Sequence, residues 1–151
     1  MQDPLIIARV NRKALEKMLD HYSIDQLNKI PEGFKNNLIW NIAHVIVTQQ
    51  LLVYKLSGLP MMVSDQMVDL YKKGTKPERN VTVEEVAEIK ELLFTTLDKT
   101  EKDLSDDVFK SYNEYTTSAG FVLTSAQNAL TFNDYHEGLH LGYAMALRKL
   151  L

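Results

Sequence analysis

Apolar residues recur every three or four positions along most of the chain, which is the spacing of amphipathic helices. Four long segments carry this pattern, over residues 4–22, 32–57, 82–104 and 117–150, and no strand-like alternation competes with them. The centre of the second segment, LIWNIAHVIV, is apolar on most sides, so that helix should lie deepest. The pattern predicts an all-α protein built as a four-helix bundle.

Local signals mark the ends of these helices. Asp3 is a candidate N-cap, because Pro4 follows it at a position that suits the first helical turn. Thr82 and Glu85 have the spacing of a capping box, which predicts the start of the third helix. The second helix is expected to run from about residue 32 to just before Gly58.

The apolar stripes predict which side of each terminal helix faces the core. In the last segment one seam with steps of three and four residues includes both histidines of that segment, so both are expected to face the core. The seam consists of Val122, Ala126, Ala129, Asn133, His136, His140, Tyr143, Leu147 and Leu150. The stripe of the first helix consists of Ile7, Val10, Ala14 and Met18.

The 58–81 connection is long for a bundle and contains SDQMVDLYKKG, which predicts a short helix capped by Ser64 and ended near Gly74. A connection of this length permits parallel neighbouring helices, so a simple up-down-up-down order does not follow from the pattern.

Composition narrows the class of protein. A chain of 151 residues is expected to form one domain, residues 1–151. The net charge of −3 gives no reason to expect a nucleic-acid partner. The N-terminus does not resemble a signal peptide and the most apolar stretch is interrupted by polar residues, so a cytoplasmic protein with no membrane association is expected. The chain has no cysteine, which excludes a thiolate nucleophile of its own.

The strongest chemical signal is His136-Glu137-Gly138-Leu139-His140, which has the H-E-x-x-H spacing of zinc metalloproteases. Two histidines four apart on a helix point the same way and can hold one metal ion. Proteases of that kind take a third ligand downstream of the motif, but residues 141–151 contain no His, Asp or Glu. The protease interpretation therefore loses most of its support.

A third ligand must come from upstream, and His44 is the best candidate. It lies inside the most apolar predicted helix, where an unpaired imidazole would be costly. Bundles build metal sites from side chains on facing helices, which suits His44 opposite His136 and His140. His21, beside a predicted helix end, is interpreted as a surface or capping residue. Three nitrogen ligands suit Zn, Ni, Cu, Fe or Co, and a purely structural role for the histidines is the alternative.

Other residues near these positions remain open in role. Glu137 is the candidate catalytic residue, as a general base; it would otherwise orient a ligand or be solvated. Asn133 and Tyr143 are one turn from the histidines and would contact a bound water or substrate, or only pack. Trp40, one turn before His44, is expected in the core.

The arrangement resembles the DinB-like superfamily, which includes bacillithiol and related thiol-dependent transferases. The resemblance rests on LIWNIAHVIVTQQLL, HEGLHLGYAMALRKLL, KKGTKP and YTTSAG. It implies a four-helix bundle in up-down-down-up order with a long crossover between the second and third helices. It also implies that His44, His136 and His140 hold a divalent metal, commonly zinc or nickel, and that the protein forms a homodimer.

Three functions follow from this resemblance and from the residues. The leading expectation is a metal-dependent thiol S-transferase-like enzyme that takes a low-molecular-weight thiol as cosubstrate, which suits a chain without cysteine. The second is a metal-dependent hydrolase with Glu137 as base. The third is a non-enzymatic metal-binding or stress-related bundle. The identity of the small-molecule substrate is not encoded in any motif of the chain.

Overall fold

The computed structural model describes residues 4–151, and it is helical apart from one short strand pair. The helices are α1 (Ile6–His21), α2 (Ile24–Asn28), α3 (Leu38–Gln49), α4 (Asp65–Tyr71), α5 (Val83–Ser105) and α6 (Ala126–Leu147). A π-helical turn, η1 (Gln50–Tyr54), and two 3-10 turns, η2 (Lys55–Ser57) and η3 (Arg148–Leu150), extend α3 and α6. The strands β1 (Tyr115–Thr116) and β2 (Val122–Leu123) pair antiparallel. The all-α prediction is confirmed.

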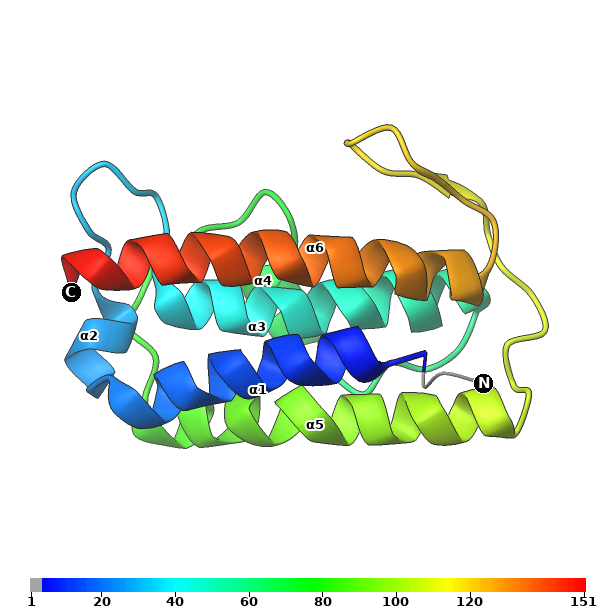
Figure 1. Ribbon diagram of the computed structural model, residues 1–151, viewed down its shortest axis with the longest axis horizontal. Helices are drawn as coiled ribbons and strands as arrows, with labels where there is room; N and C mark the ends of the chain where they lie inside the picture. Colours follow the sequence, from blue (N-terminus) through cyan, green and yellow to red (C-terminus); the bar gives the residue numbers. More distant parts are fainter. Residues whose placement is uncertain (1–3) are drawn as a thin grey trace.

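Four long helices, α1, α3, α5 and α6, lie side by side (Figure 1). α1 and α6 run in one direction along this arrangement, and α3 and α5 run in the other. α3 and α1 each pack against both α5 and α6, while the short α4 packs on α3. Within residues 4–151, none of the helices combines the length and apolar character that crossing a bilayer would require.

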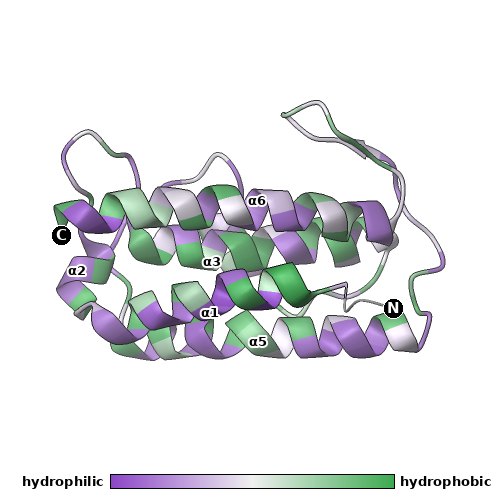
Figure 2. Cartoon of the chain, viewed as in Figure 1, coloured by the Kyte–Doolittle hydropathy of each residue, from purple (hydrophilic) through white to green (hydrophobic). Residues whose placement is uncertain are grey.

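The core is centred on α3, as its sequence predicts. Eleven of the twelve α3 residues are buried, which Figure 2 shows as a largely green helix between more mixed neighbours. Because α3 has hardly any exposed face, its polar residues must find partners inside the protein. This requirement fixes the positions of Asn41 and His44.

Two predicted helix starts are corrected by the structure. The second long helix begins at Leu38, not near residue 32, because the Asn37 side chain accepts a hydrogen bond from the Trp40 amide and caps it there. Residues before it form the separate α2, which starts with its own capping box at Ser23. The last long helix begins at Ala126, not at 117, because residues 115–123 form the β1–β2 hairpin.

Three other local predictions have definite outcomes. The Thr82–Glu85 capping box at the start of α5 is confirmed. So is the short helix after Ser64, whose hydroxyl accepts from the Met67 amide. The predicted N-cap Asp3 lies outside the described residues.

The predicted core stripe of α1 differs from the face that the structure buries, whereas the seam predicted for α6 is buried at Ala126, Ala129, Asn133 and Leu147. Ile7 and Val10 are 53% and 65% exposed, whereas Arg12 is fully buried. Within the HEGLH motif of α6, Glu137 is fully buried, while His136 and His140 are only partly buried. A buried ion pair between Arg12 and Glu137 places two charged side chains in the core, which apolar periodicity does not predict.

Candidate metal centre

Packing of α3 against α6 brings three histidines together. His44 comes from the buried middle of α3, and His136 and His140 come from successive turns of α6. One ring nitrogen from each residue lies within 4.8 Å of the others, an arrangement that could hold a metal ion. The structure thus brings together the three residues that the sequence predicts as metal ligands.

Hydrogen bonds orient two of the three imidazoles. His44 Nδ1 lies 2.6 Å from the Tyr71 carbonyl oxygen, which can only accept, so Nδ1 carries the proton. His140 Nδ1 lies 2.8 Å from Asn41 Oδ1. The Asn41 amide nitrogen donates to the Asn37 carbonyl at 2.8 Å, which identifies Oδ1 as the acceptor. Both rings therefore keep an unprotonated Nε2, as metal-ligating histidines require.

The spacing of the free nitrogens fits a shared ion. His44 Nε2 and His136 Nε2 are 3.3 Å apart. Two imidazole nitrogens bound to one zinc at about 2.05 Å with a tetrahedral angle would be about 3.3 Å apart. His136 Nδ1 is buried and has no hydrogen-bond partner among residues 4–151, so its ring is the least constrained of the three.

The electrostatic surroundings keep the imidazoles neutral. Burial, together with the neighbouring His140 and His44, lowers the pKa of His136 to about 3. Burial and His44 lower the pKa of His140 to about 4. Burial also lowers the pKa of His44, against the opposing effect of its hydrogen bond to Tyr71. Neutral imidazole is the form that binds metal, so the site is in its ligating state at neutral pH.

The three histidines form part of the wall of a pocket of about 540 Å³. Its remaining wall is largely apolar and includes Trp40, Leu51, Leu52, Leu56 and Phe132. The volume falls in the range of small-molecule sites, about 300–1,000 Å³. A metal held by the histidines would thus be open to a small organic ligand.

Trp40 connects the core to this pocket. Its ring stacks on His44 with centroids 4.6 Å apart and an interplanar angle of 12°, and its indole nitrogen donates to Thr75 at 3.1 Å. It is buried, as expected from its sequence context, and it also lines the pocket. Thr48 lies beside the site too, with its hydroxyl 3.3 Å from His44 Nε2.

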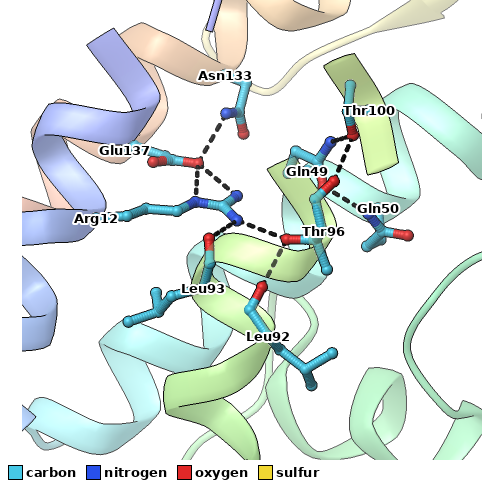
Figure 3. Close-up of polar contacts among 9 residues, drawn as sticks. All are labelled: Arg12, Gln49, Gln50, Leu92, Leu93, Thr96, Thr100, Asn133 and Glu137. Carbon is cyan, nitrogen blue, oxygen red and sulfur yellow. Dashed lines mark hydrogen bonds and ion pairs between the residues drawn. The ribbon is translucent and has the colours of Figure 1, made fainter. Parts of the chain in front are cut away.

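The Glu137 carboxylate belongs to a buried hydrogen-bond network with Arg12 and Asn133 (Figure 3). Its Oε1 accepts from Arg12 Nη2 at 2.8 Å, from Arg12 Nε at 3.1 Å and from Asn133 Nδ2 at 2.8 Å. Arg12 Nη1 also donates to the Leu93 carbonyl and to Thr96 on α5. Glu137 and Asn133 are not among the residues that line the pocket, so these two candidates point to the α1–α5–α6 interior instead.

The other candidates lie apart from the centre. His21 is exposed at the end of α1, with its ring against Tyr22. Tyr143 is 39% exposed and makes an edge contact with Phe34. The sequence pattern did not identify Asn41 and Tyr71 as the partners that orient the imidazoles. For Asn41 a signal was available, because it is a polar residue one turn before His44 in the apolar run LIWNIAHVIV.

Comparison with known proteins places the chain beside one sequence family and several solved structures. A sequence model described as the DinB superfamily matches residues 8–144. A solved structure described as a conserved protein from Enterococcus faecalis superposes with a TM-score of 0.58 at 16% identity, covering 97% of this chain and 94% of that one. That likeness concerns the fold alone. No protein with a curated description matches the chain.

Proposed function

The chain belongs to the DinB superfamily, and from that premise we propose that it is a divalent-metal-binding enzyme that transfers a low-molecular-weight thiol. The observation that carries the proposal is the convergence of three neutral imidazoles on the wall of a ligand-sized pocket. Zinc or nickel is the proposed metal, and the up-down-down-up bundle and a homodimer belong to the same proposal.

The donor set suits this chemistry. Three histidine ligands leave coordination positions open, as in catalytic rather than purely structural zinc sites. When bound, a divalent ion would lower the pKa of a thiol or water that binds to it and so supply a nucleophile. The chain has no cysteine, so the thiol must enter as a cosubstrate.

The residues of the chain have distinct tasks in this proposal. Tyr71 and Asn41 fix two imidazoles through their Nδ1 protons, which holds Nε2 toward the centre. Trp40 stacks on His44 and restricts its rotation. The leucine and phenylalanine side chains of the pocket exclude water around the bound substrate, which strengthens electrostatic interactions there.

Glu137 has a structural role in this proposal rather than that of a general base. Its carboxylate is fully buried and one oxygen already accepts three hydrogen bonds. A general base must come within hydrogen-bond reach of the proton that it removes, and the pocket wall does not include Glu137. This geometry favours thiol transfer over hydrolysis that depends on Glu137.

The test compares turnover with and without added thiol. Protein purified without chelator is assayed with the electrophile monobromobimane in the presence and absence of L-cysteine, and its metal content is measured on the same sample. We expect thiol-dependent product formation above the uncatalysed rate that is lost in His136→Gln and retained in the control His21→Gln. Product release without thiol would favour hydrolysis, and bound metal without turnover of this or other electrophiles would favour a binding protein.

A further inference from the structure

The charges that line the pocket are all of one sign. Lys55 and Lys73 lie on its wall, and no Asp or Glu side chain does. The chain as a whole has more acidic than basic residues, 20 against 17, so an acid-free wall is not a reflection of composition. A pocket with this wall presents positive potential to whatever enters it.

The two lysines are free to bind a ligand. Neither makes an ion pair or side-chain hydrogen bond with any residue in the described part of the chain, 4–151. Asp69 forms its ion pair with Lys72 at 2.7 Å, which lowers the pKa of Asp69, and the charge of Lys55 makes only a smaller contribution to that shift. In contrast, several other surface lysines are paired: Lys72, Lys90, Lys99, Lys102 and Lys110.

The metal would add to this positive charge. Three neutral imidazoles leave the full charge of a divalent ion uncompensated, whereas a carboxylate ligand would reduce it. The one carboxylate within the α6 motif, Glu137, is neutralised by Arg12. With a metal bound, the site would combine a divalent cation and two ammonium groups with no acidic side chain on its wall.

We infer that the substrate pocket selects organic anions: a small molecule with one group directed to the metal, an apolar middle, and a carboxylate or similar acidic group held by Lys55 and Lys73. The apolar middle follows from Leu51, Leu56 and Phe132, which lie on the same wall. This inference rests on the proposed function for the metal-directed group. The preference for an anion rests on Lys55 and Lys73, so it can be tested separately from the proposed function.

A matched pair of probes tests the inference. The metal-loaded protein is titrated calorimetrically with 4-(mercaptomethyl)benzoate and with its uncharged amide, which has nearly the same shape. We expect the acid to bind about five- to tenfold more tightly, since two exposed lysines each contribute a modest attraction. The preference should shrink as ionic strength rises, because exposed charges are screened.

Charge-matched variants identify the residues responsible. Lys55→Gln/Lys73→Gln should bring the acid to the affinity of the amide and leave the amide unchanged. Lys13→Gln/Lys149→Gln removes two charges from exposed lysines outside the pocket and should preserve the preference.

Metal content, measured on each sample, separates this inference from the proposed function. Equal affinities of acid and amide, or a preference unchanged in Lys55→Gln/Lys73→Gln, would overturn the inference even with metal bound. Absence of bound metal would overturn the proposed function, and the ratio of the two affinities in that sample would still decide the inference.

Discussion

Replacing Glu137, which forms a buried ion pair with an arginine of α1, should destabilise the protein far more than replacing an acidic residue that forms an exposed ion pair of similar length. The Glu137–Arg12 pair has both side chains 0% exposed and an N–O distance of 2.8 Å. Glu137→Ala would leave the Arg12 guanidinium buried with only two neutral acceptors, the Leu93 carbonyl and the Thr96 hydroxyl. Removing one partner of a buried ion pair costs about 3–5 kcal/mol, a large share of a typical stability of about 5–15 kcal/mol.

The chain offers a matched control in Arg9 and Glu101. Their N–O distance is 2.7 Å, but the Glu101 side chain is 54% exposed. Water screens such a pair, so Glu101→Ala should cost only about 0–1 kcal/mol. The two variants remove the same functional group at nearly the same distance from an α1 arginine. They differ in burial and in the second carboxylate that Arg9 keeps, Asp98 at 2.7 Å, and both differences make Glu101→Ala the milder change.

Urea unfolding of the metal-free protein measures both effects. The single tryptophan, Trp40, is buried against His44 and should report unfolding by fluorescence. In a double-mutant cycle, Arg12→Met/Glu137→Leu should be more stable than the sum of its single variants predicts by about 2 kcal/mol or more, since neither charge is left unpaired.

A loss of less than about 1 kcal/mol for Glu137→Ala, equal to that of Glu101→Ala, would contradict the structural role of Glu137. So would a Glu137→Gln variant that abolishes turnover while metal content and unfolding free energy stay unchanged. That second result would return Glu137 to the role of general base.

Three further predictions concern the metal centre and the fold. Asn41→Leu removes the acceptor of the His140 Nδ1 proton, so metal affinity measured by chelator competition should fall about 10–100-fold; an unchanged affinity would contradict the orienting role. The folded-state pKa values of His136 and His140, about 3 and about 4, lie below the unfolded value of about 6.5, so the unfolded state binds more protons between these values. The metal-free protein should therefore lose stability as pH falls from about 6.5 toward 4, and His136→Gln should reduce that slope; equal slopes would argue against burial of neutral imidazole. Thr82→Ala should cost about 1 kcal/mol in thermal unfolding through loss of the α5 cap, and an unaltered midpoint would count against the capping box.

The histidine cluster can be predicted from the sequence because each of its residues is marked by a feature of its own segment, either helical spacing or apolar neighbours. The spacing of His136 and His140 fixes their common direction on α6, and the apolar surroundings of His44 fix its burial on α3. The helical class and the start of α5 follow from equally local patterns. These features require no knowledge of which helix lies beside which.

The sequence does not predict the role of Glu137, because that role depends on a residue 125 positions away. Arg12 interrupts the apolar stripe of α1, and periodicity alone assigns the buried face to Ile7 and Val10 instead. The structure instead buries Arg12 together with Glu137, since two charged groups that neutralise each other can replace apolar residues in the core. The α3 start at Leu38 is missed for a similar reason: the Asn37 cap competes with apolar periodicity that extends further upstream.

His44, His136 and His140 are proposed to hold one divalent metal ion jointly. Anomalous X-ray diffraction from crystals of protein never exposed to chelator tests this proposal most directly, with data collected on either side of the zinc and nickel absorption edges. We expect a single strong anomalous peak about 2.0–2.2 Å from the Nε2 atoms of all three histidines. Crystals that show no peak there, with the three imidazoles hydrogen-bonded to one another or to Thr48, would contradict it.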